Sequence, residues 1–249
     1  NIVGEKKTRR LVDLAMYNRV TVSADHPMVV AGLADAAKAD DMYLPVLVDV
    51  STHIKRTGAQ PYEVVQLAER IEKEENLHFA GLLVYPSDPE DHAVLQEALA
   101  GLNKAGIGVD IVSGGGFGAS RYADQIPELT ELRVGTYVFS DYGSVMKGWD
   151  TFDNCAMTVT ASCVSRPTTD RAIFDAGRKT ISSDVYDGLY GYIVEYPEAK
   201  IYNLSEEHTH VDMSECEERP VIGEVVHIIP VHTCVVTNLH NEIYGVRGD

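Results

Sequence analysis

The stretch that decides the fold is Val109–Gly118, with the sequence VDIVSGGGFG. A run of apolar and β-branched residues, Val109 to Val112, passes directly into a loop rich in glycine. Glycine has no Cβ and exposes backbone N–H groups, so such a loop can hold a phosphate group. Ligands of α/β proteins bind at the carboxyl ends of strands, where this loop stands. We therefore predict an α/β domain with a phosphate site formed by Ser113, Gly114, Gly115, Gly116 and Gly118.

The same loop excludes two common phosphate motifs. No Gly-Lys-Ser/Thr follows it, as a Walker loop requires, and it is not the G-x-G-x-x-G fingerprint of a dinucleotide site. Sites for ATP and for dinucleotides are therefore disfavoured. The alternative interpretation is a flexible surface turn without a ligand.

The first 140 residues alternate between β-branched runs and segments of helical periodicity, which is typical of a parallel sheet wrapped by helices. Apolar stripes predict helices over residues 64–71 and 94–102, and Pro61 and Pro89 mark their starts. The predicted strands are Ile2-Val3, Arg19–Val22, Val46–Val50, Phe79–Tyr85, Val109–Val112 and Leu132–Phe139.

Six strands are two fewer than a (β/α)8 barrel needs. Counting alone therefore rates two architectures about equal: a barrel whose first units are absent from this chain, and an open doubly wound sheet. The chain starts without Met, and we expect residues to be missing at both ends.

A mostly β second domain is expected after Trp149, which gives two domains, 1–150 and 151–249. No good helix is expected in it, because Gly, Pro, Asp and Ser turns separate its apolar runs. The predicted strands are Met157–Val164, Ala172–Phe174, Tyr190–Val194, Ile201-Tyr202, Val225–Ile229 and Val231–Val236.

Composition narrows the function. The chain has 249 residues and is 45% hydrophobic, so it can bury a sizeable core. Its 38 acidic and 21 basic residues give a net charge of -17, which opposes binding to nucleic acid or an anionic membrane and favours a small-molecule substrate. Four widely spaced cysteines indicate a reducing, cytoplasmic compartment. No apolar run approaches the roughly 20 residues of a membrane helix, and no signal peptide opens the chain.

A metal site is predicted at Pro230-Val231-His232-Thr233-Cys234. On a strand, residues two apart point to the same face, so His232 and Cys234 could bind one ion. Two protein ligands leave positions open for substrate, as catalytic metals require. A cysteine ligand favours zinc, with manganese or magnesium as alternatives. The alternative is ordinary packing of both side chains, and His208, His210, His227 and His240 nearby are expected to be mostly structural or solvated.

Together these features resemble the fold-type III pyridoxal phosphate enzymes, in the branch that holds D-threonine aldolase, D-serine dehydratase and D-3-hydroxyaspartate dehydratase. The resemblance covers nearly the whole chain. The stretches that carry it are Val48–Val50, Arg56–Gly58, Gly81–Tyr85, Ser113–Gly118, Thr130–Phe139, Val164–Pro167, Asp175–Lys179, Ser205–His208 and Pro230–His240.

The resemblance implies an alanine racemase-like barrel followed by a β domain, with pyridoxal 5'-phosphate as cofactor and a homodimer that completes the active site. The glycine loop with Gly135 and Thr136 would hold the phosphate. Arg56 would lie near the ring oxygen of the cofactor, and Tyr85 and Tyr137 would line the ring pocket. His232 and Cys234 would bind the metal.

Three positions depart from the family pattern. The Schiff-base lysine belongs to the first barrel strand, and none of the nine lysines stands in that context, so it is expected outside this chain. Phe117 replaces a small hydroxyl residue in the glycine loop. Pro86 follows Tyr85 where the family has a histidine-glycine run, which leaves His92 as the candidate catalytic base.

The implied function is a metal-dependent lyase that acts on D-3-hydroxy amino acids. The cofactor accepts the electrons released at Cα, and the metal acts as a Lewis acid on the 3-hydroxyl group. Cleavage of Cα–Cβ would make the enzyme a D-threonine aldolase, which we favour narrowly. Loss of the hydroxyl would make it a D-serine or D-3-hydroxyaspartate dehydratase. A non-catalytic protein that binds pyridoxal phosphate and an amino-acid racemase are the remaining alternatives.

Overall fold

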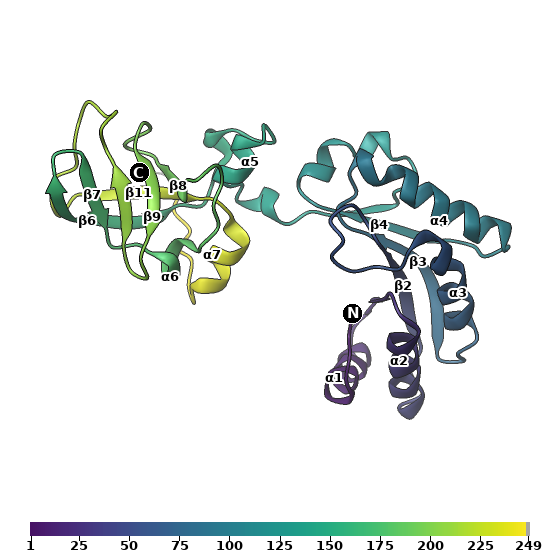
Figure 1. Ribbon diagram of the computed structural model, residues 1–249. Coiled ribbons are helices and arrows are strands. Elements are labelled where there is room, and N and C mark those ends of the chain that lie inside the picture. The colour runs from purple at the N-terminus through teal and green to yellow at the C-terminus, as the bar shows by residue number, and fades with distance from the viewer. Residues whose placement is uncertain (248–249) are drawn as a thin grey trace. The chain divides into compact units, whose positions relative to one another are not determined.

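The computed structural model describes residues 1–247 and divides into two compact units, Asn1–Val134 and Gly135–Asp249 (Figure 1). The boundary that the sequence predicts, between residues 150 and 151, lies inside the second unit. Residues 135–150 belong there because Gly143 N–H donates to the Val231 carbonyl at 3.0 Å. Tyr142 is buried in a small cluster with Ile229 and Val231. The last two residues of the predicted second domain lie outside the described ones.

The first unit alternates strands and helices. Its elements are α1 (Glu5–Ala15), β1 (Val22–Ala24), α2 (Pro27–Ala39), β2 (Leu44–Val50), α3 (Pro61–Glu72), β3 (Leu77–Val84), η1 (Pro89–Asp91), α4 (His92–Lys104), β4 (Ile111–Gly115), η2 (Gly118–Arg121), η3 (Ala123–Gln125) and β5 (Glu131–Arg133). The two predicted helices are confirmed as α3 and α4. Gln60 and Glu63 form a capping box at the start of α3, with Pro61 in its first turn.

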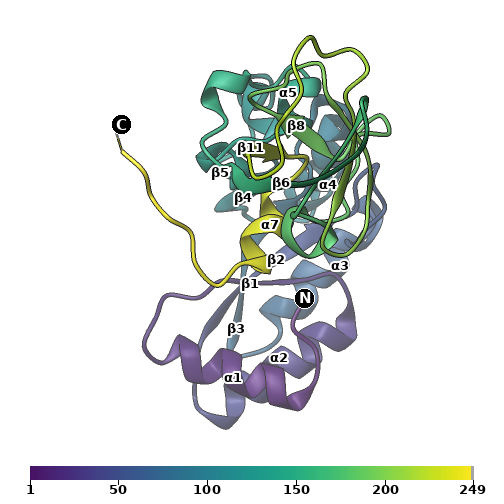
Figure 2. The same cartoon turned by 90° about the vertical axis from the view of Figure 1, so that its left-hand side faces the viewer.

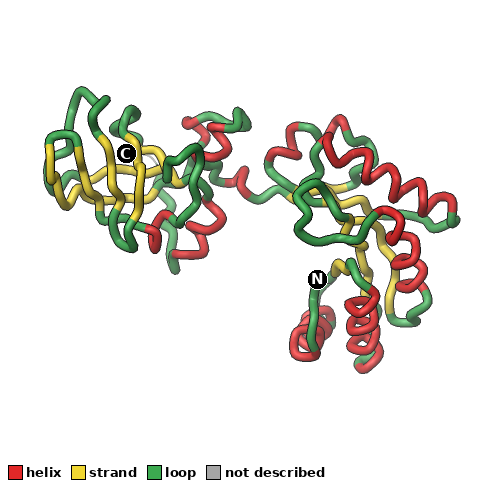
Figure 3. Tube along the Cα trace, viewed as in Figure 1, coloured by secondary structure: helices red, strands yellow, loops and turns green. Residues whose placement is uncertain are grey.

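The five strands form one parallel sheet in the order β1-β2-β3-β4-β5. This order follows the chain without a reversal, as in an arc of a (β/α) barrel, whereas a doubly wound sheet reverses its order at a switch point. Figure 3 shows helices beside the strands, and α1 packs on α2, α2 on α3 and α3 on α4. The prediction of a barrel-type α/β fold is therefore confirmed.

Three strand predictions in this unit need correction. Ile2-Val3 is not a strand: Val3 is 62% exposed and the chain enters α1 at Glu5. The strand predicted at Arg19–Val22 lies later, as β1. The last strand ends at Arg133 instead of Phe139, because the chain turns into a short 3₁₀ helix, η4 (Thr136–Val138), in which Val138 N–H donates to the Gly135 carbonyl at 3.3 Å.

The second unit is mostly β, as predicted (Figure 3). Its remaining elements are α5 (Tyr142–Met146), η5 (Phe152–Asn154), β6 (Val159–Thr168), β7 (Arg171–Phe174), α6 (Arg178–Ile181), β8 (Gly191–Ile193), β9 (Lys200–Leu204), β10 (Thr209–Asp212), β11 (Val225–Pro230) and α7 (Thr233–Leu239). The strands form an antiparallel sheet in the order β8-β11-β6-β7-β10-β9. Tyr190 N–H donates to the Ile201 carbonyl at 3.0 Å, so the two outer strands meet and the sheet is barrel-like.

Two predictions in this unit were wrong. Strand β10 was not predicted, and its residues Thr209–Asp212 alternate buried and half-buried positions. The strand predicted at Val231–Val236 is instead a short helix, α7, which begins at Thr233. The β-branched residues favour a strand locally, but Val236 packs its side chain into the core of this unit from the helix.

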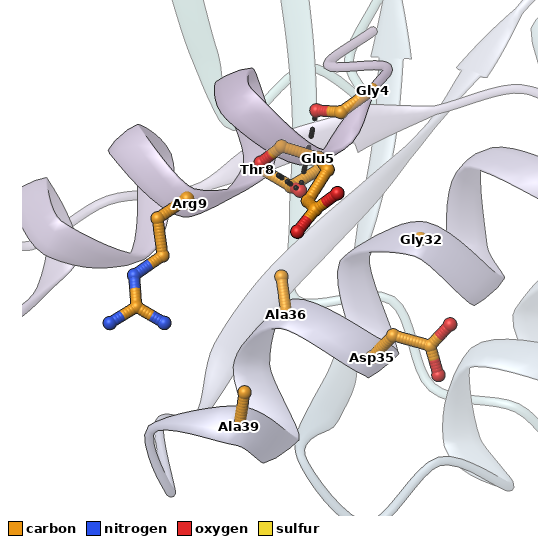
Figure 4. Close-up of a pocket in the computed structure, with 8 residues that line it drawn as sticks. All are labelled: Gly4, Glu5, Thr8, Arg9, Gly32, Asp35, Ala36 and Ala39. Atoms are coloured by element: carbon orange, nitrogen blue, oxygen red, sulfur yellow. Dashed lines mark hydrogen bonds between the residues drawn. The ribbon is translucent and has the colours of Figure 1, made fainter.

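A hollow of about 450 Å³ lies between α1 and α2, which stand side by side in Figures 1 and 2. Figure 4 shows its lining, which includes Gly32, Ala36 and Ala39 on α2 and Thr8 on α1. Thr8 Oγ1 donates back to the Glu5 carbonyl at 3.1 Å. None of the predicted site residues lines this hollow. Among the described residues, no helix is long and apolar enough to cross a membrane.

Candidate functional site

The predicted glycine loop overlaps β4, which runs from Ile111 to Gly115 instead of from Val109 to Val112, so Ser113, Gly114 and Gly115 are strand residues and only Gly116–Gly118 follow its carboxyl end. A Cβ on Gly114 would lie 2.6 Å from Ser87 Oγ, and one on Gly115 would lie 2.9 Å from Tyr85 Cδ2. Gly116 has φ +114°, which favours glycine. The glycines therefore allow the 85–87 segment to pack directly against the end of β4.

Part of the predicted phosphate cradle is already hydrogen-bonded within the protein. Gly115 N–H donates to Ser87 Oγ at 3.1 Å, and Gly116 N–H donates to the Arg133 carbonyl at 3.3 Å. Within residues 1–247, the N–H groups of Gly118 and Ala119 have no hydrogen-bond partner. The unpaired amides therefore lie at the end of the loop, beyond Gly116, on two buried residues.

A polar cluster surrounds Ser113. Ser113 Oγ donates to Glu131 Oε1 at 2.5 Å and accepts a hydrogen bond from Arg133, whose other terminal nitrogen donates to the Val84 carbonyl at 3.2 Å. Burial lowers the pKa of Arg133, and the nearby carboxylates of Glu131 and Asp49 oppose this. Glu131 and Arg133 were not predicted as site residues. The signal was their spacing, because residues two apart on β5 point to the same face.

Arg56 and Tyr85 lie together in the first unit. The Arg56 guanidinium stands 4.4 Å from the centre of the Tyr85 ring, within cation–π range. Thr52 Oγ1 donates to the Tyr85 carbonyl at 2.7 Å and connects the loop 51–58 to the same segment. The structure thus brings Arg56, Tyr85 and Gly115 into one group in the first unit.

Two carboxylates hold the loop that carries Arg56. Thr57 Oγ1 donates to Asp49 Oδ2 at 2.7 Å, and Gly58 N–H donates to Asp25 Oδ2 at 3.0 Å. Burial raises the pKa of Asp49, and the charge of Asp25 adds to this. Neither residue was predicted as a site residue, because their partners come from other parts of the chain.

His92 is not brought into this group. It begins α4, and its Nε2 lies 2.8 Å from Glu128 Oε2. Gln96 donates to the other oxygen of the same carboxylate at 3.2 Å. Within the described residues no hydrogen bond of His92 reaches the glycine loop, so its assignment as a catalytic base gains no support.

The predicted metal pair lies at the start of α7, and the strand argument for it was wrong. His232 is the extended residue just before the helix, and Cys234 is inside the first turn. Cys234 is exposed, and its Sγ lies 3.8 Å from Thr136 Oγ1. Within the described residues no group of three His, Cys, Asp or Glu side chains gathers as a metal site.

Asp141 holds His232, although the sequence analysis did not name it. Its Oδ2 lies 2.9 Å from His232 Nδ1 and accepts the Thr233 N–H at 3.3 Å. The hydrogen bond with Asp141 raises the pKa of His232, against the effect of burial. Burial alone would raise the pKa of Asp141, but its hydrogen bonds with His232, Ser144 and Thr233 together lower it.

The remaining predicted residues fall in the second unit or have other partners. Gly135, Thr136 and Tyr137 form the turn that opens this unit, and Tyr137 is 60% exposed. Among the nearby histidines, His210 pairs with Ser205, His227 with Glu195 and His240 with the Thr180 carbonyl.

Comparison with protein families gives two matches. Residues 3–143 match the family described as "Alanine racemase, N-terminal domain", and residues 156–246 match the one described as "Putative serine dehydratase domain". The first match covers more than half of the chain.

Individual proteins are similar over almost the whole chain. A D-threonine aldolase from Arthrobacter sp is 26% identical over 99% of this chain and 69% of its own length. A 3-hydroxy-D-aspartate aldolase from Paracoccus denitrificans is 26% identical over 92% of this chain and 64% of its own length. The crystal structure of D-threonine aldolase from Filomicrobium marinum is 25% identical, with a TM-score of 0.87 over 99% of this chain and 71% of that one.

Proposed function

Because the chain belongs to the alanine racemase N-terminal domain family, we propose that it forms part of a lyase that uses pyridoxal phosphate and a divalent metal to cleave D-3-hydroxy amino acids. The first choice of reaction is that of a D-threonine aldolase, which breaks Cα–Cβ and releases glycine and an aldehyde. The observation that carries the proposal is the similarity to aldolases that runs through both units, over 99% of this chain.

The residues of the first unit fit a phosphorylated cofactor. Two N–H groups are unpaired at the buried residues Gly118 and Ala119, and the cations of Arg56 and Arg133 lie in the same unit. Glycine at 114 and 115 lets Ser87 and Tyr85 pack against the end of β4. Pyridoxal phosphate supplies an electron sink for the bond broken at Cα. Ser113 to Gly118 would hold its phosphate, while Arg56 and Tyr85 would orient its ring.

The residues of the second unit fit a metal ion with open coordination positions. His232 Nδ1 is hydrogen-bonded to Asp141, so Nε2 is the nitrogen left for a metal, and the Cys234 thiol is exposed. An ion there would supply a Lewis acid for the substrate 3-hydroxyl. The cysteine favours zinc, with manganese and magnesium as alternatives.

A dehydratase is the second candidate. The match of residues 156–246 to a serine dehydratase domain supports it. The same substrate would then lose its 3-hydroxyl as water, and hydrolysis of the resulting imine by one water molecule would yield a 2-oxo acid and ammonia. Both reactions need the same two groups, so the proposed site serves either.

We also propose a reducing cytoplasmic compartment and a homodimer. All four cysteines are free, which supports the compartment. The dimer is supported by the family resemblance alone. Size-exclusion chromatography with light scattering tests it, and a monomer at working concentration would contradict it.

The products of turnover test the proposal. The full-length protein, loaded with pyridoxal phosphate and Zn²⁺, is incubated with D-threonine or D-serine, with L-threonine as the stereochemical control. We expect equal amounts of glycine and acetaldehyde from D-threonine, none after chelation, and recovery when Zn²⁺ is returned. Formation of 2-oxobutanoate and ammonia would support the dehydratase instead. Racemisation that ignores the chelator would overturn the lyase proposal.

A further inference from the structure

The environment of Asp141 differs from that of an ordinary surface carboxylate. Its side chain is buried, with only 1% of the residue exposed, and both oxygens are used. Oδ1 accepts hydrogen bonds from Ser144 N–H at 2.8 Å and Ser144 Oγ at 2.5 Å. Oδ2 lies 2.9 Å from His232 Nδ1 and accepts the Thr233 N–H at 3.3 Å. With four partners, the carboxylate has little freedom to rotate.

The backbone around Asp141 is built to bring it to His232. Asp141 caps the N-terminus of α5, and Gly143 N–H donates to the Val231 carbonyl at 3.0 Å. A Cβ on Gly143 would stand 2.8 Å from that carbonyl oxygen, so only glycine permits this approach without a shift. The residue before His232 is thereby fixed to α5, and the imidazole ring lies beside the capping carboxylate.

The contact with Asp141 decides which ring nitrogen of His232 carries the proton. A carboxylate that already accepts three N–H or O–H groups accepts a fourth from Nδ1–H, which leaves a lone pair on Nε2. Within the described residues Nε2 has no hydrogen-bond partner, and the His232 side chain is 42% exposed. Histidines that bind metals commonly donate their other ring N–H to a carboxylate, and this contact orients the ring and makes the ligating nitrogen more basic.

We infer that Asp141 is a positioning residue for metal binding, because it fixes His232 in the tautomer that has Nδ1–H and presents Nε2 to the ion. This inference rests on the proposed function, in which His232 and Cys234 bind the metal. Asp141 itself does not touch the ion. Ser144 and Thr233 hold Asp141 in turn, and together they prepare one ring orientation before the metal arrives.

The test compares the Zn²⁺ affinity of Asp141→Asn with that of a control variant, in which the carboxylate of a second carboxylate–histidine pair in the same unit is replaced. Glu195 likewise holds the Nδ1 of a histidine: its Oε1 lies 2.6 Å from His227 Nδ1, and its Oε2 accepts the His227 backbone N–H at 2.9 Å. Glu195→Gln therefore removes an equivalent carboxylate from a histidine that is not proposed as a ligand. Zn²⁺ affinity of the full-length protein is measured by competition with a fluorescent chelator, alongside the wild type and His232→Ala.

We expect Asp141→Asn to weaken Zn²⁺ binding by about 10- to 100-fold, and Glu195→Gln to bind as the wild type does. If His232→Ala weakens binding but Asp141→Asn does not, the inference is overturned while the metal part of the proposed function stands. If His232→Ala binds Zn²⁺ like the wild type, the metal assignment fails and the inference fails with it. The assay of products formed from D-threonine then tests the lyase activity independently of the metal assignment.

A second measurement covers the case in which Asp141→Asn folds poorly. In Ser144→Ala the carboxylate loses only the Ser144 Oγ contact and keeps His232. The nitrogen NMR shifts of His232 in the wild type should show Nδ1 protonated and Nε2 free in the absence of metal, and Ser144→Ala should keep that form. A wild-type ring protonated on Nε2 would overturn the inference.

Discussion

Gly114 is a residue whose missing side chain can be tested directly. A Cβ there would lie 2.6 Å from Ser87 Oγ and 2.9 Å from Leu129 Cδ2. Gly114→Ala should therefore displace Ser87, which accepts the Gly115 N–H, and lower the free energy of unfolding by about 1–3 kcal/mol. Urea denaturation measures the change.

The control for this substitution is Gly108→Ala. No heavy atom lies within 4 Å of a Cβ at Gly108, so the free energy of unfolding should change by no more than about 0.5 kcal/mol. Equal stability of the two variants would contradict the close packing of Ser87 against the loop.

Among single residues, the proposed cofactor and metal contacts were easier to predict from the sequence than the residues that position them. Arg56, Tyr85 and the glycine loop were named, and the structure brings Arg56, Tyr85 and Gly115 together. Asp141 was not named, because its contact with His232 joins positions 91 residues apart. No local pattern reports such a contact, since it depends on how α5 packs beside the end of β11.

The loop between β2 and α3 depends on a buried carboxylate, Asp49, and this gives a pH-dependent prediction. The pKa of Asp49 is raised from 3.8, mainly by burial, so the native state holds this proton more tightly than the unfolded chain does. The contribution of Asp49 to stability therefore falls as pH rises above about 4. Asp49→Asn removes this dependence, so its free energy of unfolding relative to the wild type should rise between about pH 4 and pH 7.

Asp212 supplies a control, because its pKa is lowered whereas that of Asp49 is raised. Hydrogen bonds from Ser214 lower the pKa of Asp212, so its contribution is present at neutral pH and is lost as pH falls. Asp212→Asn should therefore lose stability relative to the wild type as pH rises toward about 4, and its relative stability should change little between about pH 4 and pH 7. Chemical denaturation at each pH measures the free energy of unfolding of the two variants. If both free energies change with pH in the same direction relative to the wild type, the environments assigned to Asp49 and Asp212 are contradicted.

Helices and strands were predicted well where the apolar pattern was long and regular, and poorly where the segment was short. The helices α3 and α4 carry long apolar stripes, and β2 and β3 are buried runs. By contrast, the Val231–Val236 segment has a strand-like composition, yet it forms α7. Tertiary contacts overrode local propensity there, since Asp141 binds both His232 and the Thr233 N–H at the helix start.

For the whole molecule, the metal is proposed to serve catalysis and not folding. The second unit has its own core of buried apolar side chains, among them Phe174, Ile193 and Val211. Two protein ligands at the surface would add little to it, unlike the four of a structural zinc site. Dialysis against a chelator should therefore leave the unfolding temperature within about 4 °C of the metal-loaded protein while turnover stops. Unfolding of the protein on chelation would contradict a purely catalytic metal.

The fold class was predictable because it depends on alternation along the chain, whereas the choice between two architectures was not. Six predicted strands could not separate an arc of a barrel from a doubly wound sheet. The sequential order of β1 to β5 separates them, and strand order is a property of long-range pairing that local patterns do not encode.

The most direct test of the whole account is one variant with two measurements, made on the full-length protein. His232→Ala removes the proposed metal ligand in the second unit and leaves the proposed phosphate loop in the first unit intact. We predict that it loses cleavage of D-threonine but keeps the absorbance of bound pyridoxal phosphate. A variant that cleaves D-threonine at the wild-type rate, or one that loses the cofactor absorbance, would contradict the account.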